Sequence, residues 1–209
     1  MIIEQSNKIN VILNQLFNDS KNDHFKIMKG LAKSAFRSIQ PMDFKDVYLS
    51  ISKEQGTELV ALIKENNLKN IVEFGTSFGI STLFLAQGIL ETKGKIITTE
   101  LIESKAKRAT DNFKNAGVLN LVDVRIGNAM ETLKGHDEAI DLLFLDGWKD
   151  LYLPLFNMLA PNFHKQSIIY VDNANMAASK AFLKVIAETD KYELESKFGG
   201  KVVLISINK

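Results

Sequence analysis

The first third of the chain shows the hydrophobic spacing of amphipathic helices. Apolar residues recur there at intervals of three and four positions, which places them on one face of a helix. The first set is Ile9, Ile12, Leu13, Leu16 and Phe17, and the second is Phe25, Met28, Leu31, Ala32, Ala35 and Phe36. Pro41 ends the second pattern, and a third helix is predicted from just after Ser52 to residues 66–67.

From about residue 70 the pattern changes to short apolar runs that alternate with helical stretches. The runs lie at 70–74, 95–99, 121–126, 140–146 and 167–172, and the helices are predicted near 79–90, 103–116, 149–159 and 176–189. This alternation predicts an α/β fold with a doubly wound, mostly parallel, Rossmann-like sheet. The end of the chain differs, because residues 192–198, Gly199-Gly200 and residues 201–207 have the pattern of an antiparallel hairpin.

The composition fits one domain of ordinary size. With 209 residues, 45% of them hydrophobic and 24% charged, the chain can bury a sizeable core. Its 26 basic and 25 acidic residues nearly cancel, so neither nucleic acid nor an anionic membrane is an expected partner. The chain has no cysteine, which excludes disulfides, thiolate metal sites and a cysteine nucleophile.

No targeting signal is expected. The start of the chain, MIIEQSNKIN, has no basic segment followed by an apolar run, and no apolar stretch approaches the length that spans a bilayer. A cytoplasmic location is therefore the expectation. The apolar faces of the N-terminal helices are compatible with a homodimer.

Polar residues follow the predicted parallel strands, at the sheet edge where open α/β proteins bind their ligands. They are Glu73, Glu100, Asn128, Asp146 and the pair Asp172-Asn173. Candidate binding and catalytic residues are therefore expected in this series and in the loops beside it.

The loop after the first strand combines an acidic residue with two glycines. Gly75 and Gly79 would let the backbone turn sharply and approach a ligand. The pattern is E-x-G-x-x-x-G rather than the G-x-G-x-x-G of dinucleotide sites, and Glu73 would repel a pyrophosphate. The loop thus favours a cationic or amine-bearing ligand, although an ordinary strand-to-helix turn looks the same. Glu100, one strand further, is either a ligand for the two hydroxyls of an adenosine ribose or a solvated acid.

The segment 141–150 and the next strand end hold most of the candidate chemistry. Asp146 ends a buried strand, where a carboxylate needs a partner. With Asp172 and Asn173 it forms an all-oxygen set of the kind that Mg²⁺ or another hard divalent cation prefers. Each of these residues, and Lys149 beside them, also has an ordinary alternative as a turn, a helix cap or a surface charge. The basic run Lys105, Lys107 and Arg108 is expected to be a solvated helix face.

Four separated stretches, together with the spacing from Gly56 to Glu73, carry a resemblance. They are EFGTSFGIS at 73–81, TTEL at 98–101, FLDGWKDLYLP at 144–154 and YVDNA at 170–174. In this order they resemble the cation-dependent class I O-methyltransferases, the group typified by catechol O-methyltransferase. The resemblance implies an S-adenosylmethionine-dependent methyltransferase domain at 46–209, preceded by an N-terminal helical extension or lid at 1–45.

The resemblance also implies roles for individual residues. Cofactor contacts would come from Ile51, Glu73, Gly75, Ser77 and Ser81 at the methionine moiety, Glu100 at the ribose, and Leu101, Ala129, Met130 and Trp148 at the adenine. Asp146, Asp172 and Asn173 would hold the divalent cation, with Asp146 also beside the cofactor. Lys149 would be the general base that takes the proton of a small phenolic acceptor with adjacent hydroxyls.

One departure from the family concerns the acceptor. The family often has a longer loop after the Asp-Asn pair, whereas here residues 174–176 lead directly into a predicted helix. A roomy, adaptable acceptor site is therefore expected. Two other functions stay open: a nicotinamide-dependent oxidoreductase on the same fold, which the missing middle glycine disfavours, and a non-catalytic cofactor-binding dimer, which the intact set of polar residues disfavours.

Overall fold

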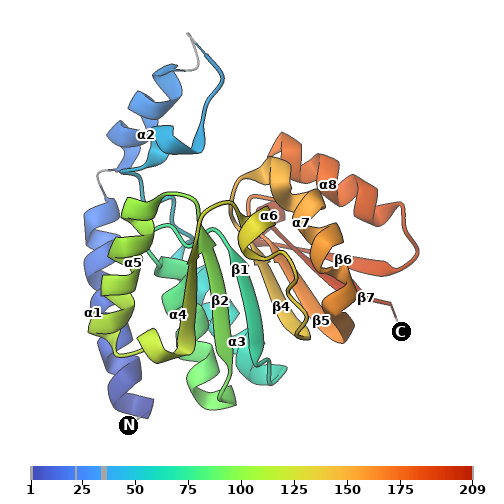
Figure 1. The fold of residues 1–209 in the computed structure, drawn as a ribbon, viewed down its shortest axis with the longest axis horizontal. Helices are drawn as coiled ribbons and strands as arrows, with labels where there is room; N and C mark the ends of the chain where they lie inside the picture. The colour runs from blue at the N-terminus through green and yellow to red at the C-terminus, as the bar shows by residue number, and fades with distance from the viewer. Residues whose placement is uncertain (1, 22, 34–36, 209) are drawn as a thin grey trace.

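The computed structural model describes residues 2–21, 23–33 and 37–208, and a sheet lies at its centre (Figure 1). Within these residues the sheet has seven strands in the order β3-β2-β1-β4-β5-β7-β6. The strands are β1 (Asn70–Phe74), β2 (Lys95–Glu100), β3 (Val122–Ile126), β4 (Ile140–Leu145), β5 (Phe163–Val171), β6 (Tyr192–Lys197) and β7 (Val202–Ile207). The predicted Rossmann-like α/β class is confirmed.

The first five strands run parallel, and the last two add an antiparallel edge. β1 pairs in parallel with β2 and β4, so that Val72 lies beside Ile97 and Leu143. β7 is antiparallel to β6, as the hairpin pattern predicted, and it is also antiparallel to β5. Leu142, Leu143 and Phe144 are fully buried, because helices cover both faces of β4.

One face of the sheet carries the helices of the N-terminal half. They are α1 (Ile2–Ser20), α3 (Lys53–Glu65), α4 (Ile80–Thr92) and α5 (Glu103–Ala116). α1 buries Ile9, Leu13 and Leu16 in the same hydrophobic core as the sheet residues of this face. The predicted third helix is α3, which starts with a capping box between Ser52 and Gln55.

The opposite face carries α6 (Ala129–Thr132), α7 (Tyr152–Leu159) and α8 (Ala177–Ala187). Short 3₁₀ turns complete the chain: η2 (Pro41–Phe44), η3 (Leu119–Leu121), η4 (Lys149–Leu151), η5 (Ala160–Asn162) and η6 (Phe198–Gly200). A second core under α7 and α8 contains Leu145, Tyr152 and Phe182. Among the described residues, no helix combines the length and the apolar character needed to cross a membrane.

The segment formed by α2 (Asp23–Ala32) and η2, called the arm below, stands out from the body (Figure 1). The sequence pattern predicted a helix here with an apolar face, but Phe25, Met28 and Leu31 on that face are 82%, 55% and 41% exposed. They are exposed because α2 packs against η2 rather than against the sheet, as the close approach of Gly30 to Phe44 shows. Ala35 and Phe36, the last members of the predicted face, lie outside the described residues.

Candidate active site

A cavity of about 500 Å³ lies at the carboxyl ends of β1, β2 and β4. The loops after these strands line it, and so do Pro41 and Phe44 of the arm, Leu49 and Met176. The lining also contains many of the residues singled out from the sequence: Gly75, Ser77, Glu100, Leu101, Ala129, Asp146, Trp148, Lys149 and Asn173. Parallel strands bring these residues to one edge of the sheet although they are far apart in the chain.

Gly75 makes the close approach of two of these loops possible. Its φ of +109° lies in the region that favours glycine, and a Cβ on it would lie 2.8 Å from the carbonyl carbon of Asp146. The backbone after β1 therefore lies directly against the backbone after β4. As a result, the glycine loop and the Asp146 segment share one wall of the cavity.

Glu73 holds the glycine loop from inside. Its carboxylate is fully buried and accepts hydrogen bonds from Ser81 Oγ at 2.5 Å, Thr82 Oγ1 at 2.6 Å and Thr98 Oγ1 at 2.6 Å. Burial raises the pKa of this carboxyl, and the three hydroxyls oppose that shift. Glu73 thus joins the start of α4 to β2.

Glu100 lines the cavity with its orientation fixed by the backbone. Its Oε2 accepts the Ser77 N–H at 2.8 Å, and its Oε1 accepts the Ile102 N–H at 2.8 Å. Burial raises the pKa of the Glu100 carboxyl, while these N–H groups and Lys105 lower it. Each carboxylate oxygen can accept more than one hydrogen bond, so a ribose hydroxyl can still bind here.

Lys105 corrects one expectation from the sequence. It was expected on a solvated face, and Lys107 and Arg108 are indeed exposed, but the Lys105 side chain is only 4% exposed and lines the cavity. Its Nζ donates to the Val47 carbonyl oxygen at 2.8 Å and to Ser77 Oγ at 3.3 Å. Burial lowers the pKa of Lys105. The first turn of α5 faces inward at this position, which the charge pattern alone did not reveal.

Asp146 and Asp172 are poorly solvated carboxylates at the ends of the neighbouring strands β4 and β5. Burial, together with the charges of Asp172 and Glu73, raises the pKa of Asp146 to about 8, although Lys149 opposes the shift. The side chains of Asp146 and Asp172 are 11% and 3% exposed. Two poorly solvated carboxylates whose charges repel each other are stabilised when a cation binds between them.

Lys149 forms an ion pair with Asp146. Its Nζ donates to the Gly147 carbonyl oxygen at 2.9 Å and lies 3.4 Å from Asp146 Oδ1. Its neighbour Trp148 lines the cavity and donates its Nε1–H to Asp150 at 3.1 Å. The turn at η4 therefore brings both side chains to the cavity.

The polar side chains of this cavity, among them Asp146 and Asn173, offer oxygen donors of the kind that divalent cations bind. In the part of the chain that the structure describes, no group of three or more His, Cys, Asp and Glu side chains is arranged to hold a metal. If Asp146, Asp172 and Asn173 held a cation, its protein ligands would be two carboxylates and one amide oxygen, and water or acceptor oxygens would complete the coordination. Such an oxygen-rich, partly open set suits Mg²⁺.

Some residues that the resemblance assigned to the cofactor or the cation are not among the residues that line the cavity. They are Ile51, Glu73, Ser81, Met130 and Asp172. Ser81 is tied to Glu73, and Asp172 is 2% exposed. Direct contacts from these residues therefore stay predictions.

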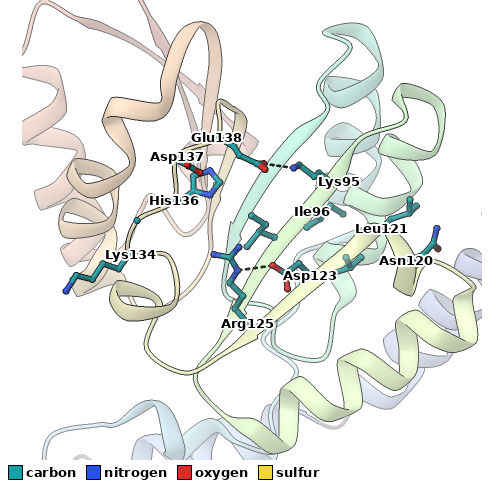
Figure 2. A pocket seen from close by; sticks show the side chains of 13 residues that line it. Lys95, Ile96, Asn120, Leu121, Asp123, Arg125, Lys134, His136, Asp137 and Glu138 are labelled. Atoms are coloured by element: carbon teal, nitrogen blue, oxygen red, sulfur yellow. Dashed lines mark hydrogen bonds and ion pairs between the residues drawn. The ribbon is translucent and has the colours of Figure 1, made fainter.

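A second hollow, of about 610 Å³, lies over the beginnings of β2 and β3, away from these strand ends (Figure 2). Its charged lining residues largely pair with each other: Lys95 with Glu138, and Arg125 with Asp123. A ligand would have to displace these ion pairs, so the first cavity is the better candidate for an active site.

A family model described as O-methyltransferase matches residues 10–197. The chain belongs to the O-methyltransferase family. It is 29% identical over 143 residues to a catechol O-methyltransferase of Mycobacterium tuberculosis, a match covering 68% of this chain and 62% of that protein. It is 32% identical over 127 residues to a caffeoyl-CoA O-methyltransferase of Medicago sativa, covering 57% and 47%. The matches thus span less than two thirds of the length of these relatives.

Solved structures of O-methyltransferases share the fold. A methyltransferase of Podospora anserina bound to S-adenosylhomocysteine superposes with a TM-score of 0.72 at 21% identity, covering 88% of both chains. An O-methyltransferase of Bacillus cereus in complex with S-adenosylhomocysteine gives 0.68 at 21% identity, covering 88% of this chain and 97% of that one. Membership of this family favours methyl transfer over the oxidoreductase and the non-catalytic dimer.

Proposed function

We propose that this O-methyltransferase family member transfers the methyl group of S-adenosylmethionine to a hydroxyl oxygen of a small phenolic acceptor with adjacent hydroxyls, assisted by a divalent cation. The observation that carries the proposal is the composition of one cavity. It is lined both by Glu100, Leu101 and Ala129, which suit an adenosine, and by Asp146 and Lys149, which suit acid–base chemistry.

The nucleoside end would bind the cofactor through a fixed carboxylate. Ser77 and Ile102 hold Glu100 through their backbone N–H groups, so the carboxylate needs no rearrangement to accept the ribose hydroxyls. Trp148 supplies an aromatic surface in the same cavity. Gly75 lets the loop after β1 pack against the Asp146 backbone, and the methionine moiety would bind along this loop.

Asp146, Asp172 and Asn173 would hold the cation, with Asn173 at the cavity surface and Asp172 beneath it. A divalent cation bound there would lower the pKa of a phenolic hydroxyl, which is ordinarily near 10. In the reaction the acceptor oxygen forms a bond to the methyl carbon while the bond from that carbon to sulfur breaks. The Lys149 amine would take up the hydroxyl proton, and the products would be a methyl ether and S-adenosylhomocysteine.

The acceptor would lie against an apolar wall. Phe44, Leu49, Leu151 and Met176 line the cavity, and α8 begins only a few residues after Asn173. This wall suits a flat aromatic ring, and the flexible Met176 side chain can adapt to rings of different shape. We therefore infer that the acceptor site is adaptable.

A methylation screen tests the proposal. Catechols, caffeoyl-type phenols, flavonoids and polyketide-like phenols would be incubated with S-adenosylmethionine, each with Mg²⁺ and with a chelator. We expect methyl ether formation from acceptors with adjacent hydroxyls, and its loss in chelator. Full activity in chelator would overturn the role of the cation. Failure to bind S-adenosylmethionine in calorimetry would overturn the activity itself.

A further inference from the structure

We propose that Gln55 is a positioning residue for the Asp172 carboxylate and thereby sets the affinity of this chain for a divalent cation. The inference rests on the proposed function, because Asp172 is one of the residues proposed to hold the cation. Gln55 lies near the start of α3, far from Asp172 in the sequence. It is uncharged and belongs to none of the motifs assigned to the site.

The contact between the two side chains is direct and buried. Gln55 Nε2 donates to Asp172 Oδ1 at 2.8 Å, and the two residues are 1% and 2% exposed. Within the described ranges, Gln55 is the one side chain that forms a hydrogen bond with this carboxylate; Lys201 Nζ lies further away, at 3.9 Å. The bond engages Oδ1 and leaves Oδ2 for a cation.

The amide of Gln55 can adopt only one orientation here. Its Oε1 accepts the Ser52 N–H at 3.1 Å and a hydrogen bond from Lys201 Nζ at 2.6 Å. Both partners are donors, so they must face the amide oxygen, and the amide NH₂ is left to face Asp172. The three contacts therefore fix the side chain as a donor toward the carboxylate.

The same contacts join three elements around the proposed cation site. Ser52 caps α3, Asp172 follows β5, and Lys201 lies between β6 and β7. The Lys201 carbonyl oxygen also accepts the Ala174 N–H at 2.8 Å, which holds the chain just after Asn173. Gln55 thus lies where the scaffold can fix the Asp172 rotamer before a cation arrives.

A neutral donor is well suited to this task. A hydrogen bond from an amide orients a carboxylate without cancelling its charge, so the carboxylate keeps its attraction for the cation. Partners that orient metal ligands typically change metal affinity by about 10- to 100-fold when they are removed. We expect an effect of that size from Gln55.

The test is a titration with Mn²⁺, with free Mn²⁺ measured by electron paramagnetic resonance in the presence of S-adenosylhomocysteine. Gln55→Leu and Gln55→Met both remove the donor, and the second keeps the length of the side chain. We expect the dissociation constant for Mn²⁺ to rise about 10- to 100-fold in both variants. Gln87→Leu is the matched control, because it removes a comparable hydrogen bond, from Gln87 Nε2 to Ser6 Oγ at 2.8 Å, on α4.

A second readout separates positioning from general damage. In each folded Gln55 variant, S-adenosylhomocysteine should bind with unchanged affinity when no metal is present, and excess Mg²⁺ should restore most of the turnover. Unchanged Mn²⁺ affinity in Gln55→Met would overturn the inference, and so would an equal loss of metal and cofactor binding. A wild-type chain that binds no Mn²⁺ would instead show that the proposed cation site itself is wrong.

Discussion

Glu100 is a single side chain whose role can be tested by binding alone. Glu100→Ala should weaken S-adenosylmethionine binding about tenfold or more, since charge-assisted hydrogen bonds contribute about 1.5–3 kcal/mol. Calorimetry would measure the change. Glu103→Ala is the control, because Glu103 is an exposed residue that pairs with Lys107. Equal affinities for Glu100→Ala and the wild type would remove Glu100 from the cofactor site.

Lys149 is expected to act on turnover and not on cofactor binding. Its Nζ contacts Asp146 and Gly147 at the end of the cavity where the acceptor is proposed to bind. Lys149→Met should lower kcat roughly 100- to 10,000-fold, the usual effect of losing a general base. The affinity for S-adenosylhomocysteine should stay within about twofold, because the variant loses no proposed contact with the cofactor and the binding free energy should change little. Normal turnover in this variant would show that water or another group takes the proton.

The titration of Glu73 should make the stability of the folded chain depend on pH. Burial places the pKa of its carboxyl in the folded chain above the ordinary value of 4.5. Its contribution to stability is therefore full below pH 4.5 and is lost as the pH rises through the folded pKa. Glu73→Gln removes this titration, so the melting temperature of the variant minus that of the wild type should increase as the pH rises above 4.5. Glu91→Gln, at an exposed position, should show no such trend, and a flat difference for Glu73→Gln would contradict the assignment.

At the scale of elements, the strand-to-helix turn after β1 depends on close backbone packing. Gly75 and Gly135 both have positive φ, of +109° and +75°, but a Cβ meets the Asp146 backbone at 2.8 Å only at Gly75, and nothing within 4 Å at Gly135. Gly75→Ala should therefore cost about 2–4 kcal/mol in the free energy of unfolding, against about 1 kcal/mol for Gly135→Ala. Urea unfolding of both variants measures the difference. Equal costs would show that the loops after β1 and β4 can separate freely.

The helices and strands themselves followed from local periodicity. The runs at 70–74 and 140–146 became β1 and β4, and the capping signal at Ser52 marks the start of α3. The arm shows what local periodicity does not predict. Periodicity correctly gave a helix with an apolar face, but periodicity does not state what that face packs against, and the face of α2 is exposed.

At the scale of the whole molecule, the cavity lies between the sheet and the arm, and this placement predicts acceptor breadth. Its volume of about 500 Å³ is within the usual range for small-molecule sites. We expect several phenols with adjacent hydroxyls to be methylated with kcat/KM values within about tenfold of one another, because apolar walls discriminate weakly between similar rings. Steady-state assays over the acceptor panel measure this, with singly hydroxylated phenols as controls. Strict preference for one small catechol, with one regioisomeric product, would contradict the prediction.

The sequence by itself determined the succession of strands and helices along the chain and the series of polar residues that follow the strands. It could do so because hydrophobic periodicity and turn residues act locally, and because parallel strands carry their carboxyl ends to one edge. Glu100, Asp146 and Lys149 were therefore expected near one another, and the structure places all three in one cavity.

Only the tertiary structure decided which polar groups face that cavity and which lie behind it. Lys105 turned out to be buried against Val47 and Ser77, and Gln55 to donate to Asp172, because helices far away in the sequence pack across the sheet. Burial and hydrogen-bond partners are properties of such long-range packing. The spacing of residues along the chain does not show which distant segments pack together, so it could not predict these contacts.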